Sequence, residues 1–106
     1  MTLTELLAKF TTLSFPVRFD HVEDGTRIPF GVLTFSQNNF AADNMVYIEM
    51  SQFDLRVYLD KLDGLIMSEV KDFLNTNELP YELQITYIDD AKAYELDYTF
   101  GAITED

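Results

Sequence analysis

The chain has 106 residues, of which 47% are hydrophobic and 25% charged, so it is long enough for one domain, residues 1–106, built around a single core. Its 19 acidic and 7 basic side chains give a net charge of -12, which argues against a basic surface that binds phosphates. The absence of cysteine excludes disulfides, thiolate catalysis and thiolate metal sites. No apolar run approaches the roughly 20 residues of a membrane span, and no signal-peptide pattern is present.

The chain opens on the pattern of an amphipathic helix. Thr2 and Glu5 have the spacing of a capping box, so the helix is predicted to begin near Thr2. Pro16 ends it or begins an extended stretch. The apolar residues that recur on one helical face are Leu3, Leu6, Leu7 and Phe10.

Two strands are predicted to follow. Apolar and polar residues alternate over residues 17–21, and residues 30–35 are apolar on both faces apart from Thr34. The segment 23–26 has the composition of a turn, with Gly25 suited to a positive φ. These two strands could therefore form a hairpin.

Residues 36–44 are predicted to be a polar loop that carries one large apolar residue, Phe40. A long strand is predicted over residues 45–60, but its apolar residues change phase, from even-numbered positions up to Met50 to odd-numbered positions from Phe53. Since side chains alternate strictly along a regular strand, we expect a bulge or bend near Ser51 and Gln52, or two strands that meet there. The two sets, residues 46–50 and 53–57, are then expected to contact different surfaces.

The second half of the chain predicts a helix and a hairpin. Asp63 is a candidate N-cap for a helix that ends near residues 75–77. Residues 82–87 and 94–100 alternate around a turn at Asp89 and Asp90, which predicts a hairpin with one buried face. Residues 103–106 are expected to form a loose acidic tail. The helical stripe consists of Ile66, Val70, Phe73 and Leu74.

The element order is therefore α-β-β-β-α-β-β. It predicts an α+β fold in which an antiparallel or mixed sheet of about five strands carries two helices on one face.

The order of these segments resembles the tail-terminator family of long-tailed bacteriophages and prophages, also called tail-completion or head-tail joining proteins. The resemblance covers most of the chain and includes IPFGVLTF, an Asn-Phe-x-Ala-Asp loop, a tyrosine soon after, a strand ending in Tyr-Leu-Asp-Lys where the family pattern is Tyr-Leu-x-Asp-Lys, and a Tyr-rich strand after an acidic turn. Leu62 stands where a second lysine is common in the family, which puts one local charged contact in doubt.

The resemblance implies a structural protein of the virion tail, assembled in the host cytoplasm, rather than an enzyme. It implies a ring, by that resemblance a hexamer, which caps the tail tube, ends tube polymerisation and presents a surface to the head completion or connector protein. DNA would pass through the bore without specific binding, and no membrane or cofactor is implied. The residues expected to contact the tube or a neighbouring subunit are Asn38, Asn39, Phe40, Ala42, Asp43 and Tyr47.

Other readings of the sequence remain open. Phe40 could instead be an inward-folded anchor of its loop, and the acidic composition could belong to a DNA mimic that inhibits a host nucleic-acid-binding protein. His21 lies near Asp20, Glu23 and Asp24, but it is more simply a strand end beside a solvated turn than a metal site. One histidine without any cysteine gives too few ligands for a specific metal site. The sequence has no nucleophile elbow and no phosphate-cradling glycine loop.

Overall fold

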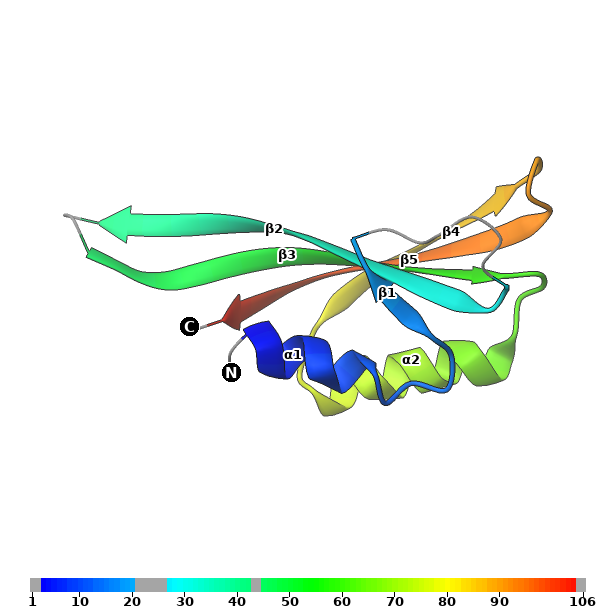
Figure 1. The fold of residues 1–106 in the computed structure, drawn as a ribbon, viewed down its shortest axis with the longest axis horizontal. Coiled ribbons are helices and arrows are strands. Elements are labelled where there is room, and N and C mark those ends of the chain that lie inside the picture. Colours follow the sequence, from blue (N-terminus) through cyan, green and yellow to red (C-terminus); the bar gives the residue numbers. More distant parts are fainter. Residues whose placement is uncertain (1–2, 21–26, 43–44, 105–106) are drawn as a thin grey trace.

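The computed structural model describes the backbone of residues 3–20, 27–42 and 45–104, and the side chains of residues 4–20, 27–34 and 52–101. The predicted α+β class and element order are confirmed (Figure 1). The elements are α1 (Leu3–Phe10), β1 (Val17–Phe19), β2 (Phe30–Ala42), β3 (Met45–Leu59), α2 (Gly64–Thr76), β4 (Tyr81–Ile88) and β5 (Ala93–Thr104).

The five strands form one mixed sheet in the order β1-β2-β3-β5-β4. The expected hairpin between the first two strands is wrong, because β1 pairs with β2 in parallel, Val17 opposite Gly31 and Phe19 opposite Leu33. Asp20 turns the chain away at the end of β1 with a left-handed φ of 76°. The connection from there to Phe30 is longer than a tight hairpin loop and can return the chain to the starting end of β1.

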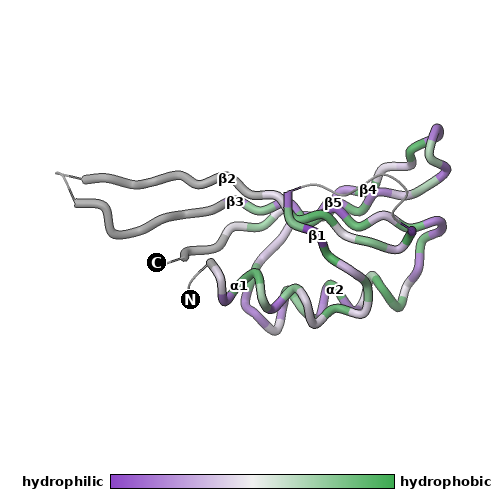
Figure 2. The backbone as a smooth tube through the Cα atoms, viewed as in Figure 1, coloured by the Kyte–Doolittle hydropathy of each residue, from purple (hydrophilic) through white to green (hydrophobic). Residues whose placement is uncertain are grey.

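Both helices cover the same face of the sheet, and the core lies between the helices and the sheet (Figure 1). Along each helix, hydrophobic and hydrophilic residues alternate as an amphipathic helix requires (Figure 2). Phe10 of α1 contacts Phe73 of α2, with ring centroids 4.8 Å apart, and stacks on Phe100 of β5 at 5.9 Å. Phe53 of β3 stacks on the other side of this group, 5.2 Å from Phe100. The two helices and the two central strands thus share one aromatic cluster.

The predicted loop at residues 36–44 is wrong, because β2 continues through it to Ala42. Its backbone pairs with β3 from Phe30 opposite Tyr58 to Ala42 opposite Met45. The segment has neither glycine nor proline, so nothing in it prevents an extended backbone, and the facing strand supplies the hydrogen-bonding partner that the sequence pattern did not reveal.

The predicted irregularity near Ser51 and Gln52 is also wrong, since both residues lie in unbroken ladders with β2 and with β5. The register instead shifts between Phe40 and Ala41, which leaves Tyr47 without an opposite residue. Positions 48 and 50 then fall on the other side of β3 from positions 53, 55 and 57. The surfaces that the side chains of residues 46–50 contact lie outside the part of the structure that is described.

The predicted hairpin of β4 and β5 is confirmed, with Tyr87 opposite Tyr94 and Leu83 opposite Tyr98. The expected buried face holds for β5, where Leu96, Tyr98 and Phe100 are buried. On β4 it is wrong, because Leu83, Ile85 and Tyr87 are exposed by 38%, 43% and 48%. Their strand is the last of the sheet, and Tyr81 at its start is the β4 residue packed against the core.

The predicted N-cap at Asp63 is confirmed, since its carboxylate accepts hydrogen bonds from the backbone N–H groups of Leu65 at 2.9 Å and Ile66 at 3.4 Å. The predicted stripe of α2 is also confirmed, with Val70 and Leu74 buried and Ile66 and Phe73 packed against the core.

Replacing Asp63 by Ala is expected to lower the free energy of unfolding by about 1 kcal/mol, because two N–H groups of the first turn lose their acceptor. Urea unfolding should show a lower midpoint and an unchanged slope. Asp60→Ala removes the same charge from the exposed turn before α2 and is the matched control. Equal midpoints for the two variants would contradict a capping role for Asp63.

Candidate interface sites

Five of the six predicted interface residues lie at one end of the sheet. Asn38, Asn39, Phe40 and Ala42 belong to β2, and Tyr47 belongs to β3, where the register shift leaves it without an opposite residue. Asp43 lies outside the described residues. The pairing of Asn38 with Met50 and Phe40 with Ile48 brings residues distant in sequence to the same hairpin. We call this hairpin end, residues 38–42 and 45–50, the arm.

The arm extends past the rest of the sheet (Figure 1). On one side, β1 pairs with β2 only from Gly31 to Leu33. On the other side, the pairing of β5 with β3 ends at Thr104 opposite Glu49. The last part of the hairpin is therefore two-stranded, and its backbone edges are free of the other described strands. Such edges are templates for pairing with another chain.

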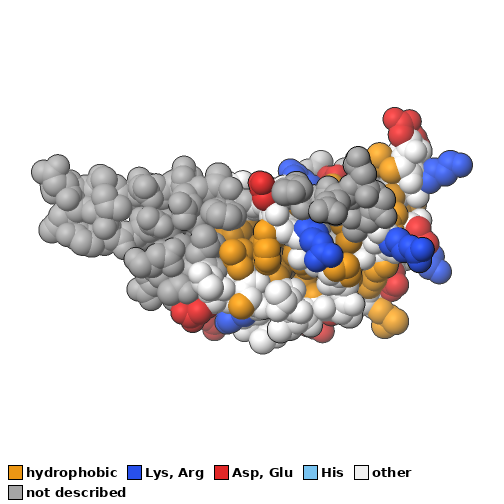
Figure 3. All heavy atoms as spheres, in the orientation of Figure 1, with side chains coloured by type: hydrophobic (Ala, Val, Ile, Leu, Met, Phe, Trp, Pro, Cys, Tyr) orange, Lys and Arg blue, Asp and Glu red, His pale blue; other side chains and the backbone are white. Residues whose placement is uncertain are grey.

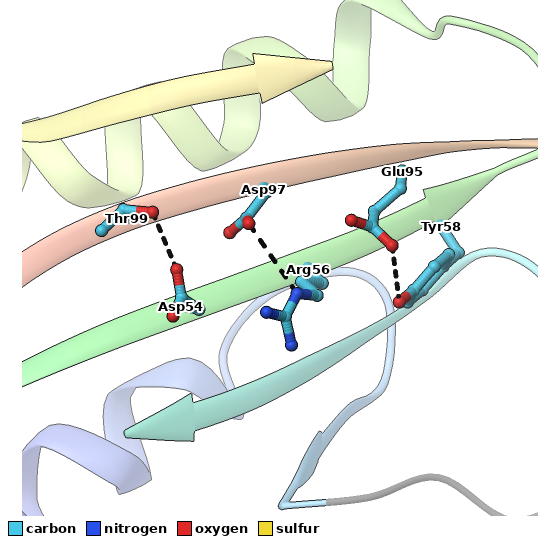
Figure 4. Close-up of polar contacts among 6 residues, drawn as sticks. All are labelled: Asp54, Arg56, Tyr58, Glu95, Asp97 and Thr99. Carbon is cyan, nitrogen blue, oxygen red and sulfur yellow. Dashed lines mark hydrogen bonds and ion pairs between the residues drawn. The ribbon is translucent and has the colours of Figure 1, made fainter. Parts of the chain in front are cut away.

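The face of the sheet away from the helices carries a row of polar side chains (Figure 4). Three neighbouring cross-strand pairs of β3 and β5 each make a polar contact. The Thr99 hydroxyl donates to Asp54 at 2.8 Å, Arg56 Nε lies 3.8 Å from Asp97 Oδ2, and the Tyr58 hydroxyl donates to Glu95 at 3.0 Å. Cross-strand pairs of this kind each stabilise a sheet by roughly 0.2–1 kcal/mol. We call these six residues the polar row.

Asp97 lies at the centre of the polar row, beside Asp54 and Glu95. Burial raises the pKa of Asp97 above its ordinary value, and the negative charge of Asp54 and a hydrogen bond with it raise the pKa further. The guanidinium of Arg56 opposes this shift. Asp97 Oδ1 is buried with no hydrogen-bond partner among the described residues. The guanidinium of Arg56 therefore lies among three carboxylates, those of Asp54, Glu95 and Asp97. This excess of negative charge favours the protonated form of Asp97.

Tyr58 closes the polar row at the end near the turn before α2. Its partial burial and its hydrogen bond to Glu95 raise its pKa to about 12, so the hydroxyl remains a hydrogen-bond donor at physiological pH. Its ring packs against Phe30 of β2 with centroids 5.0 Å apart. This residue joins the apolar and polar parts of the open face.

On the other side of the molecule, α1 and α2 enclose an open hollow of about 410 Å³. Glu69 of α2 accepts hydrogen bonds from the backbone N–H of Ser14 at 2.7 Å and from its hydroxyl at 2.6 Å. The Lys9 ammonium donates to Asn77 at 3.0 Å. These contacts tie the end of α1 to α2, and the residues concerned are engaged with each other.

His21, with Glu23 and Asp24, lies outside the described residues. Across the part of the chain that is described, no three His, Cys, Asp or Glu side chains are grouped to hold a metal ion. Neither described helix is long and apolar enough to cross a membrane.

No protein-family model matches the chain, and a search of curated proteins finds no match.

Sequence reasoning missed the polar row and the exposure of β4. The alternation of Asp54, Arg56 and Tyr58 with apolar neighbours was a signal for an open sheet face, and Asp97 and Glu95 repeat it on β5. That these residues stand directly opposite one another depends on register, which alternation alone does not give.

The raised pKa of Asp97 predicts how stability depends on pH. The folded state binds this proton more tightly than the unfolded state, so the stability contributed by Asp97 is greatest below the ordinary aspartate pKa and is lost as pH rises through the raised pKa. Asp97→Asn cannot titrate. Its urea midpoint relative to wild type should therefore increase as pH rises through this window.

Asp90→Asn, which removes the same charge from the exposed β4–β5 turn, is the control for overall charge. A carboxyl ¹³C titration of Asp54→Asn should also show a lower Asp97 pKa than in wild type. An Asp97 pKa at or below its ordinary value in the wild-type protein would refute this description of the polar row.

Proposed function

We propose that this chain is a structural subunit of a bacteriophage or prophage tail that forms a ring on the end of the tail tube. The ring stops tube polymerisation and offers a surface to the head completion or connector protein, and the subunit catalyses no reaction. The sequence resemblance supports this proposal through the ordered segments described above. By that resemblance the ring is a hexamer, made in the host cytoplasm and incorporated into the virion tail.

The observation that carries the proposal is the arm. A two-stranded hairpin that continues past β1 and β5 has backbone edges that its own sheet leaves open within the described residues. Passing such an edge to a neighbouring copy is a heterologous contact, and heterologous contacts related by rotation close into rings. Five of the interface residues proposed from sequence belong to this hairpin, namely Asn38, Asn39, Phe40, Ala42 and Tyr47.

The net charge of -12 suits a ring through which DNA slides. Fixed negative charge along a bore disfavours adhesion of phosphates. The same charge makes identical subunits repel one another, so ring formation requires salt or a partner surface.

Contacts within the polar row favour the ring over the alternative of an acidic DNA mimic. A mimic needs carboxylates that face its target at phosphate-like spacing. Asp54, Glu95 and Asp97 instead each have a polar partner within the sheet, Thr99, Tyr58 and Arg56 respectively. Carboxylates held in this way stabilise the sheet and are less able to imitate a phosphate backbone.

The ring proposal predicts self-association that increases with ionic strength, because salt screens the repulsion between subunits. Native mass spectrometry and sedimentation of the purified protein, over a range of salt and with added tail tubes, should reveal one closed species of several copies. A control at constant ionic strength and increasing protein concentration separates screening from mass action. A strict monomer under all conditions, with and without tubes, would contradict the proposal.

Phe40→Ala is expected to weaken ring or tube binding by about 2 kcal/mol, the scale of an interface hot spot, with little change in thermal stability. Thr34→Ala, on the same strand but within the body of the sheet, is the comparison for a general effect on β2. If Phe40→Ala unfolds the monomer while its residual binding persists, Phe40 is a core residue and the arm is not the contact.

A further inference from the structure

The edge of the sheet at β4 combines an open backbone with exposed apolar side chains. In the sheet order, β4 neighbours only β5, so its other edge is free of the remaining described strands. The eight residues of β4 are long for an edge strand that faces solvent, since proteins commonly protect such edges by charge, proline or short length. Leu83, Ile85 and Tyr87 stand at alternate positions along it, all exposed.

These three side chains continue the helix-covered face of the sheet. Leu83 lines a groove of about 150 Å³ between β4 and α2, together with Tyr81, Tyr98, Met67, Ser68 and Lys71. Tyr87 contacts Tyr94 of β5, with ring centroids 4.9 Å apart. A further strand beside β4 would set its own alternate side chains next to this apolar strip.

The other face of the same edge is polar, and Glu82 is its acidic residue. Glu82, Gln84 and Thr86 stand opposite Thr99, Asp97 and Glu95 of β5, so the edge leads directly into the polar row. Arg56 already lies against Asp97. Lys71 is on the helix side, in the groove. The open face beside β4 therefore presents Glu82 on the edge strand itself and, one strand further in, Glu95, where long basic side chains from an added strand can approach them.

We propose that β4 is a docking edge for an extended segment of a partner protein that alternates apolar and basic side chains. The segment adds a sixth strand to the sheet. Its backbone pairs with β4, its apolar side chains cover Leu83, Ile85 and Tyr87, and its lysines or arginines face Glu82 and the polar row. This is strand addition, in which main-chain hydrogen bonds supply affinity and alternate side chains supply specificity.

A second copy of this chain is a poorer occupant of the edge. The β4 strand of another copy has the sequence YELQITYI, with Glu82 and no lysine or arginine. Pairing two such strands would bring two molecules of net charge -12 together and leave the polar face without cations. Charge complementarity thus selects a basic partner strand. The inference rests on β4 and does not depend on the ring.

The test uses the full chain and a synthetic peptide of about ten residues, the length of a long strand, alternating valine and lysine. Binding is measured by fluorescence anisotropy at low salt and located by ¹H–¹⁵N chemical-shift changes. We expect saturable binding with shifts concentrated at residues 81–88. A peptide of the same composition with valines and lysines in pairs, and one alternating valine and glutamate, should bind at least about fivefold more weakly if alternation and charge both matter.

Matched variants locate the contact on the protein. Glu82→Lys should weaken binding of the alternating basic peptide about fivefold, whereas Asp72→Lys, the same charge reversal on the exposed surface of α2, should leave it within about twofold. Ile85→Thr keeps a strand-forming residue but removes apolar area, and should weaken binding by a similar factor.

Four results would overturn the proposal. Equal binding of the alternating and paired peptides would indicate non-specific attraction to an acidic protein. Shifts outside β4, or equal effects of Glu82→Lys and Asp72→Lys, would place the contact elsewhere. Shifts at residues 81–88 that grow with protein concentration alone, and that the peptide does not change, would show that a second copy occupies the edge.

Discussion

The structure depends on one aromatic contact group between the helices and the central strands. Phe10, Phe73, Phe100 and Phe53 form a continuous series of ring contacts from α1 and α2 to β5 and β3. Phe10 and Phe53 are fully buried, so this group removes a large apolar area from water at the point where all layers meet. The interface candidates lie away from this group. The arm continues beyond the pairing of β1 and β5, the exposed apolar side chains of β4 lie at one edge of the sheet, and the polar row lies on the far face.

The far face is stabilised by a different balance of interactions. Side chains alternate between the two faces of β3. Leu55 and Val57 are buried under the helices, so Asp54, Arg56 and Tyr58 lie on the far face. The carboxylates on this face repel one another, which weakens the sheet. Two hydrogen bonds and one ion pair to the cross-strand partners Thr99, Glu95 and Asp97 offset this repulsion. The pair of Arg56 and Asp97 is long and half-exposed, and such pairs contribute little. The raised pKa of Asp97 shows that the balance on this face is incomplete.

Elements with a strong periodicity of hydrophobic residues were predictable from the sequence. The stripes of α1 and α2, the Asp63 cap and the β4–β5 hairpin follow from spacing and capping chemistry that act locally. The errors lie where a partner strand decides the outcome. Residues 36–42 read as a loop because Asn38 and Asn39 disfavour strands on average, yet pairing with β3 makes them extended.

The phase change in residues 45–60 was assigned to an irregularity near Ser51 and Gln52, where both ladders are continuous. The register of β2 and β3 shifts instead between Phe40 and Ala41, a position that the alternation of apolar residues in 45–60 does not indicate. Leu96 is buried, whereas Ile85, its direct neighbour across the hairpin, is exposed. Their patterns are alike in sequence, but β4 is the last strand of the sheet and β5 lies inside it.

The two proposed contacts respond to salt in opposite directions, and this follows from the net charge alone. A contact between copies of a chain with charge -12 is opposed by repulsion, so screening strengthens it. A contact between the edge at β4 and a basic segment is favoured by attraction, so screening weakens it. If both proposals hold, the charge that opposes contacts between copies also disfavours pairing of two β4 edges, while it attracts a cationic strand. The acidity of a chain with open sheet edges would then select which strands join its sheet.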